Sequence, residues 1–509
     1  MKTTEKMYPY KKTACQLFAC ALFLCVGPTV HAERPNLVII LTDDLGYGDV
    51  SFLNPESKIQ TPRMDALARE GVWATDAHTP SAVCSPTRYG LLTGRYPWRH
   101  PALKKEVLWP WDESAIEATR PTLPRMLREA GYDTACIGKW HLGFEWPWKG
   151  GEMPPLNQIR GGRNSIATVA QFDFSKPITG GPWAAGFDHY FGEGVINFPP
   201  YAFIEDGRLL CDPVDIQPDQ LQSIGTRGGI HGAGPGEEGW TFEQVLPTTT
   251  LRAVEYIRAK AESEKPFFVF FTPGSPHTPV VPTKEFQGRS QAGLYGDFVI
   301  QTDDAVGQVV DALKESGQFE NTLLIVTSDN GPCPNQRDLI QRFDHLPAGT
   351  FRGMKIDTFE GGHRVPFIAS WPQGRLAGGR EIEPVIGLID LYATVAGLLG
   401  VALPDGAAPD SLNIMPSLRE NRTVRTEAVY HSFDGARGLR QGDWVYLEPG
   451  GVRPEPGWYL ERFGIVPVEA SEYLFDLSGD PGQKRNLAHE HPDKVEALRQ
   501  RLAEITETE

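Results

Sequence analysis

Four short apolar runs, spread along the chain, constrain its fold more than any other feature. They span residues 37–41, 132–137, 267–271 and 323–327. Each is rich in β-branched or aromatic residues without alternation, which is typical of strands buried on both faces of a sheet. Helical patterns lie between them, such as 61–71 and 122–131, which begin with threonine and proline and end at glycine. This alternation predicts an α/β fold with a large, mostly parallel sheet flanked by helices.

Polar residues follow each of these runs directly or after a short loop. In chain order they are Asp43 and Asp44, Lys139 and His141, His277, and Asp329 and Asn330. Taken singly, sequences such as Asp-Asn-Gly are ordinary turns. Because the carboxyl ends of parallel strands meet at one edge of a sheet, the four groups together predict a single pocket.

A second, smaller unit is predicted at the carboxyl end. Proline, glycine and aspartate cluster at 407–416, which suggests a boundary between a catalytic domain over 33–415 and a subdomain over 416–509. Residues 438–447 are typical of a hairpin with a Gly-Asp turn, and 493–505 of a helix. The subdomain is therefore expected to be α+β with an antiparallel sheet.

The first 32 residues predict a secretory signal. A basic leader precedes the apolar run 14–26, and Val30-His31-Ala32 offers a cleavage site of small residues. The alternatives are an uncleaved anchor and a lipoprotein attached at Cys20. No other segment is long and apolar enough for a membrane span. We expect an exported protein, periplasmic or extracellular, or lysosomal or secretory in a eukaryote, without stable membrane insertion after cleavage.

Charge and cysteine content narrow the function classes. Loss of residues 1–32 would take the net charge from −16 to −19, which gives no electrostatic basis for binding nucleic acid. The mature chain would keep Cys84, Cys136, Cys211 and Cys333, too few for a disulfide scaffold. If Cys84 is modified, the other three allow at most one disulfide.

Residues 144–240 are rich in glycine, proline and aromatic residues and show little periodicity. Long irregular segments in enzymes are usually binding loops, although a peripheral decoration is the alternative. The substrate contacts expected in this loop region are Arg160, Arg163, Asn164, Tyr201 and His231.

The most specific motif is Cys84-Ser85-Pro86-Thr87-Arg88, followed at once by Tyr-Gly-Leu-Leu-Thr-Gly-Arg over 89–95. By itself the cysteine would be interpreted as a small buried residue. Ser85 would cap a helix and Pro86 would occupy its first position.

The twelve residues closely resemble the signature of type I sulfatases, which depend on formylglycine and belong to the alkaline phosphatase superfamily. The resemblance covers nearly all of residues 35 to 490. Its further segments are 35–46, 138–143, 276–279, 328–331, 353–366, 439–444 and 475–488.

The resemblance implies that Cys84 is oxidised by a maturation enzyme to Cα-formylglycine (3-oxoalanine), whose hydrate attacks sulfur. It implies a metal site formed by residue 84 with Asp43, Asp44, Asp329 and Asn330. These four supply only oxygen ligands, which favours Ca²⁺, with Mg²⁺ as the alternative.

The resemblance also assigns roles to the cationic residues. Arg88 and Lys139 are expected to position the nucleophile and the sulfate. His277 and Lys355 are expected to bind the sulfate and assist departure of the alcohol oxygen. His141 is expected to take a proton from the second hydroxyl of the hydrate, which releases sulfate.

The function expected from this resemblance is a secreted sulfatase acting on a sulfated polysaccharide or a glycosaminoglycan-type saccharide. Aromatic and arginine side chains of the long loop region would suit sugar rings and anions. Two alternatives remain open: a phosphodiesterase or phosphonate monoester hydrolase of the same superfamily, and a noncatalytic glycan-binding protein in which Cys84 is unmodified.

Overall fold

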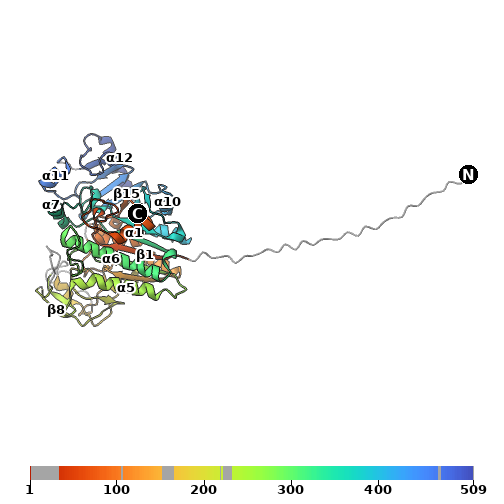
Figure 1. Cartoon of the computed structure of the whole chain (residues 1–509), viewed down its shortest axis with the longest axis vertical. Coiled ribbons are helices and arrows are strands. Elements are labelled where there is room, and N and C mark those ends of the chain that lie inside the picture. The colour runs from red at the N-terminus through yellow and green to blue at the C-terminus, as the bar shows by residue number, and fades with distance from the viewer. Residues whose placement is uncertain are drawn as a thin grey trace. The chain divides into compact units, whose positions relative to one another are not determined.

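The structure, a computed structural model, describes residues 1, 34–104, 107–151, 166–217, 219–221, 232–467 and 472–507. The predicted signal segment, apart from Met1, and Arg160, Arg163, Asn164 and His231 lie outside the described residues. Arg34–Glu509 form one compact unit (Figure 1). Within the described residues, no helix is both long and apolar enough to cross a membrane.

Within the described residues, ten strands form the central sheet, in the order β13-β2-β12-β11-β1-β10-β4-β5-β6-β7. The neighbours β11, β1, β10, β4 and β5 are parallel, while β12, β6 and β7 pair antiparallel with their neighbours. This confirms the prediction of a mixed, mostly parallel sheet. The bounds are β1 Asn36–Thr42, β2 Val72–Ala74, β4 Asp133–Gly138, β5 His189–Gly192, β6 Ile204–Glu205, β7 Arg208–Leu209, β10 Phe267–Thr272, β11 Thr322–Ser328, β12 Phe367–Ser370 and β13 Arg380–Ile382.

Both faces of this sheet are covered, as the unbroken apolar runs require. Along β1, Ile39 and Leu41 enter one core cluster and Val38 and Ile40 another. Figure 1 shows α5 and α6 running beside the sheet. Helices α1 (Pro62–Glu70), α5 (Val245–Ala259) and α6 (Gly293–Glu315) pack into the second cluster. Helices α2 (Cys84–Thr93), α3 (Leu123–Glu129) and α9 (Leu391–Leu399) pack into the first.

The start of α2 differs from the prediction. Ser85 does not cap this helix, and Pro86 does not occupy its first position: the helix begins at Cys84, after Val83 in an extended conformation. The Ser85 hydroxyl accepts a hydrogen bond from Leu108 N at 3.2 Å instead. Proline is tolerated at the third position because the first-turn N–H groups have no acceptor within the helix. Cys84 is therefore the first residue of a buried helix.

The carboxyl end forms the predicted antiparallel sheet. Strands β16 (Arg437–Gln441) and β17 (Trp444–Leu447) form the expected hairpin, between β15 (Glu427–His431) and β18 (Tyr473–Asp476). Helix α12 (Pro492–Glu507) packs on this sheet. A domain boundary at 415/416 stays a prediction. The remaining elements are β3 Ala77–His78, β8 Val214–Ile216, β9 Gly234–Gly236, β14 Ile386–Gly387, α4 Gly181–Ala185, α7 Asp338–Phe343, α8 Glu360–His363, α10 Met415–Glu420 and α11 Gly457–Phe463.

A buried polar network joins this sheet to the central one through Asp76. The Asp76 Oδ1 accepts hydrogen bonds from His78 Nε2 at 2.7 Å and from Arg440 Nη1 of β16 at 2.6 Å. The guanidinium of Arg364, which follows α8, lies 3.2 Å from the same oxygen. Burial by itself would raise the pKa of Asp76, but Arg364, His78 and Arg440 hold it well below its usual range.

We expect Asp76→Asn to lower the free energy of unfolding by about 3–5 kcal/mol, because it leaves the buried Arg440 and the largely buried Arg364 with one negative charge fewer. The contribution of Asp76 is complete above the ordinary carboxyl pKa of about 3.9 and is lost as the pH falls toward the lower folded pKa. Urea unfolding at pH 7 and at about pH 2, inside the range where the contribution is being lost, measures both effects. Glu285→Gln, at an exposed acid, is the control; an equally small effect of both variants would contradict the prediction.

Candidate active site

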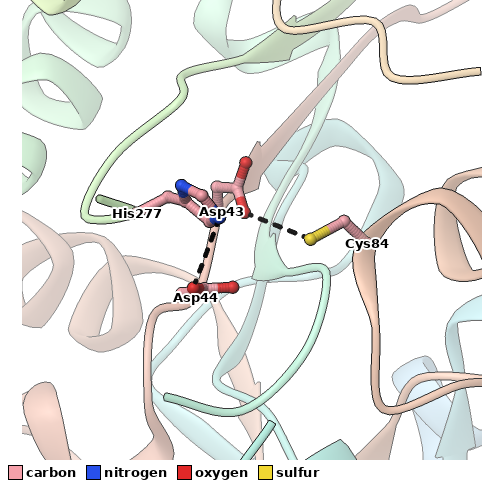
Figure 2. A group of neighbouring side chains, drawn as sticks. All are labelled: Asp43, Asp44, Cys84 and His277. Atoms are coloured by element: carbon pink, nitrogen blue, oxygen red, sulfur yellow. Dashed lines mark hydrogen bonds and ion pairs between the residues drawn. The ribbon is translucent and has the colours of Figure 1, made fainter. Parts of the chain in front are cut away.

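The carboxyl ends of β1, β10, β4 and β11 meet at one edge of the sheet. Backbone hydrogen bonds extend the pairing beyond the strands: Asp43 N donates to Ser275 O at 3.0 Å, Asp329 N to Thr42 O at 3.0 Å, and Lys139 N to Thr272 O at 2.8 Å. The polar residues that follow the strands are thereby fixed side by side, as Figure 2 shows for Asp43, Asp44 and His277.

Cys84 enters this cluster from the opposite side, at the first position of α2 (Figure 2). Its Sγ lies 3.6 Å from Asp43 Oδ1 and 3.1 Å from Lys355 Nζ. The N-terminal end of a helix carries a partial positive charge, which favours an oxyanion at this position. Burial raises the pKa of the thiol, so unmodified Cys84 is neutral and a poor nucleophile.

Two buried cations, Arg88 and Lys139, contact the carboxylates of Asp43 and Asp329. Arg88 donates to Asp329 Oδ2 from Nε at 3.1 Å and from Nη2 at 2.9 Å, and Lys139 donates to Asp43 Oδ2. Arg88 Nη1 also donates to Lys139 O at 2.7 Å. Burial would raise the pKa of Asp43, but nearby positive charges, with that of Lys139 largest, hold it well below its usual range. For Asp329, burial and the Asp43 charge raise the pKa to about 6.

Asp44 lies at the other side of the cluster. Its Oδ1 accepts from Asn330 Nδ2 at 2.7 Å and from Lys355 Nζ, and His277 Nε2 lies 3.8 Å from its Oδ2. Two oxygen atoms, Asp44 Oδ2 and Asn330 Oδ1, are buried without a hydrogen-bond partner among the described residues. Unpaired buried oxygens beside two further carboxylates fit a hard divalent cation.

The two histidines present different nitrogens to the site. His141 Nε2 lies 3.0 Å from Leu108 O, so it donates its proton there, and the buried Nδ1 is left without a partner among the described side chains. Burial and then Lys139 lower the pKa of His141 well below its usual value. His277 Nδ1 lies 2.6 Å from Thr278 O, and burial lowers the pKa of His277 to about 4. Both rings are neutral, and His141 Nδ1 is a proton acceptor.

Backbone strain coincides with this site. Asp44 and His141 have φ angles of 64° and 55°, in the left-handed region that residues with a Cβ seldom adopt. Such strain persists only where the surrounding contacts fix it, and it is often found at functional sites. Here both strained residues lie within three residues of a strand that ends at the cluster.

Glu193 is a site neighbour that the sequence analysis missed. It follows β5 directly, is 3% exposed, and has no hydrogen-bond partner on either carboxylate oxygen in the described part of the chain. Burial raises its pKa to about 7, against the opposing effect of Lys139. The only sequence signal was an acidic residue after a four-residue strand, too short to be predicted.

The structure thus brings together all the residues predicted for catalysis and metal binding. Of the predicted substrate contacts, only Tyr201 is described; it is buried, and its hydroxyl donates to Gly232 O at 2.8 Å. The described cysteines Cys84, Cys136, Cys211 and Cys333 are free.

Comparison with known proteins identifies the family of this chain. The family model named Sulfatase matches residues 35–401. The chain belongs to the sulfatase family. It is 31% identical to an N-acetylgalactosamine-6-O-sulfatase of Bacteroides thetaiotaomicron over 99% of both chains. It is also 31% identical to arylsulfatase A of Bos taurus, over 95% of this chain and 90% of the relative. This sulfatase is therefore a sulfuric ester hydrolase.

Solved structures agree with this assignment. A structure from a study of glycosaminoglycan metabolism by Bacteroides thetaiotaomicron matches this sulfatase with a TM-score of 0.79 and 30% identity, over 93% of this chain and 99% of the other. A structure in complex with a neocarrahexaose matches with a TM-score of 0.67 and 22% identity, over 93% of each chain, and shares the fold.

Proposed function

We propose that this sulfatase is an exported enzyme that hydrolyses 6-sulfate esters of N-acetylgalactosamine residues in glycosaminoglycan-type saccharides. The reaction would use formylglycine made from Cys84 and a bound Ca²⁺. The chemistry is supported by the position of Cys84, whose sulfur lies between Lys355 and Asp43 beside unpaired buried oxygens. The substrate class is supported by the activity named for the relatives from Bacteroides thetaiotaomicron and Homo sapiens, the latter 27% identical over 93% of this chain.

Asp43, Asp44, Asp329 and Asn330 would hold the metal. Ca²⁺ bound there would neutralise the sulfate oxygens, and Mg²⁺ is the alternative cation. Formylglycine at position 84 would supply a hydrated aldehyde as the nucleophile. The neutral, buried thiol of unmodified Cys84 supports the need for this conversion.

The cationic residues divide into two groups by their partners. Three nitrogens of Arg88 are bonded to Asp329 and Lys139 O, so Arg88 would hold the metal ligands in place. Lys355 contacts both Cys84 Sγ and Asp44. An ammonium between the nucleophile and a metal ligand would bind a sulfate oxygen, and Lys139 would bind another. Because His277 Nδ1 already donates to Thr278 O, His277 would bind a sulfate oxygen through Nε2 in its protonated form, which the charge of the sulfate favours.

His141 would act as the base. Its Nε2–H is held by Leu108 O, so Nδ1 carries the lone pair, and no described group uses it. A low pKa keeps this nitrogen unprotonated at neutral pH, ready to accept a proton as sulfate leaves.

A panel of defined saccharides tests the substrate. We expect sulfate release from N-acetylgalactosamine 6-sulfate to be at least about 100-fold faster than from the 4-sulfate isomer, because an ester displaced to another carbon misses the positioned nucleophile. Ion chromatography of released sulfate measures both rates. Faster cleavage of a phosphodiester than of any sulfate ester would instead favour the superfamily alternative, and lack of turnover with an unmodified Cys84 would favour a glycan-binding protein.

A further inference from the structure

The backbone of Glu193 is fixed beside the segment that carries Lys139 and His141. Glu193 O accepts a hydrogen bond from Trp140 N at 3.1 Å and another from the Tyr190 hydroxyl at 3.0 Å. The next residue, Gly194, accepts from His141 N at 3.0 Å. The backbone of Glu193 is therefore held against the active-site end of β4.

The carboxylate of Glu193 lies behind the site rather than on its surface. A Cβ added to Gly274, in the loop that leads to His277, would lie 3.2 Å from Glu193 Oε1. Glu193 Oε1 therefore lies close to the loop that follows β10. The exposed fraction of Glu193 is 3%, so the carboxylate lies in the interior, as Lys139 does.

The charges around Glu193 come from several elements. Lys139 at the end of β4 and Arg88 of α2 favour the carboxylate, and Asp43 after β1 opposes it. Cys136 and Tyr190 are the other titratable neighbours, and, besides burial, the charge of Glu193 raises the pKa of each of them. Burying a carboxylate whose oxygens make no well-formed hydrogen bond costs free energy, which favours a partner outside the described side chains.

Among the described residues, the ammonium of Lys139 has N–H donors that no acceptor uses. Its ammonium has three N–H groups, and within the described residues only Asp43 accepts from it. Arg88, by contrast, is bonded through three nitrogens to Asp329 and Lys139 O. Lys139 and Glu193 nevertheless make no direct hydrogen bond in the described structure. The two unused donors of Lys139 and the two unpaired, buried oxygens of Glu193, on adjoining segments, match the hydrogen-bonding capacity of one bridging water molecule.

We propose that Glu193 is a positioning residue that, through a bridging water, directs the ammonium of Lys139 between Asp43 and the sulfate of the substrate. One donor of Lys139 goes to Asp43, one to the water, and the third to a sulfate oxygen. This inference rests on the proposed role of Lys139 in sulfate binding.

The test uses the full, matured enzyme with Glu193→Met, which has a similar size and only a weak thioether acceptor, and Glu193→Gln, which keeps one strong acceptor. The affinity for inorganic sulfate is measured by calorimetry, and kcat and KM with 4-nitrophenyl sulfate. We expect Glu193→Met to weaken sulfate binding and lower kcat/KM by about 10–100-fold, with partial recovery in Glu193→Gln, because partners that orient a ligand have effects of this size.

Asp303→Asn is the matched control. Asp303 is also a buried carboxylate with a raised pKa of about 7, but it accepts from Arg63 N and Met64 N at the start of α1. We expect this variant to change the melting temperature without changing sulfate affinity. Unchanged sulfate affinity in Glu193→Met would overturn the proposal, as would a high-resolution structure without a water between Lys139 Nζ and Glu193. If the enzyme hydrolyses 4-nitrophenyl sulfate but no sulfated saccharide, that result would contradict the proposed substrate and not the proposed role of Glu193.

Discussion

Replacing Cys84 by alanine should lower sulfate release by at least about 10⁴-fold, the size of effect seen when a covalent nucleophile is removed. Cys84 occupies the first turn of a buried helix, and alanine fits there without disturbing α2. The loss should therefore occur in a protein that unfolds at nearly the same temperature as the parent. Rates with 4-nitrophenyl sulfate and thermal unfolding measure the two properties.

The matched control is Cys136→Ala. Cys136 is also a free, fully buried cysteine, on β4, and its pKa is likewise raised by burial. Its replacement should cost some stability through a small cavity but retain sulfatase activity. Mass spectrometry of the peptide containing residue 84 adds a second measurement. Activity should scale with the fraction of chains converted to the aldehyde, and full activity in unconverted protein would contradict the proposed nucleophile.

Removal of the divalent cation should abolish activity and lower the melting temperature. A cation at 100 times its dissociation constant stabilises the folded state by about 2.7 kcal/mol. Asp44→Ala removes an unpaired buried oxygen and should weaken cation binding by at least about 100-fold, because a lost carboxylate ligand acts directly on a hard ion. Chelation followed by addition of Ca²⁺ or Mg²⁺, with activity and melting temperature as readouts, identifies the preferred ion.

Asp76→Asn serves as the control for this experiment. This variant is expected to be less stable than the parent enzyme. Residue 76 belongs to the network that joins the carboxyl-terminal sheet to the central sheet, so the variant should keep the full Ca²⁺-dependent rise in melting temperature. The prediction is wrong if Asp44→Ala shows the same rise as the parent enzyme, or if thoroughly chelated enzyme stays active.

The strands at the centre of the sheet were predictable from hydrophobic pattern. The observed β1 and β11 extend each predicted run by one residue at both ends. Such strands are buried on both faces, so they must be apolar throughout, and this leaves an unmistakable signal. The start of α2 was not predictable, because Ser85 has a distant partner, Leu108 N, that competes with its role as a cap.

The sequence by itself determined the elements, the family resemblance and the set of oxygen, cationic and sulfur groups available for chemistry. Only the tertiary structure decided which of these groups contact one another. Lys355 touches a sulfur 271 residues earlier in the chain, Arg88 is bonded to Asp329, and Glu193 lies buried beside the Lys139 segment. These contacts depend on strand order and on the paths of loops, neither of which is encoded in local periodicity, so chemically similar residues acquire different roles only after the chain has folded.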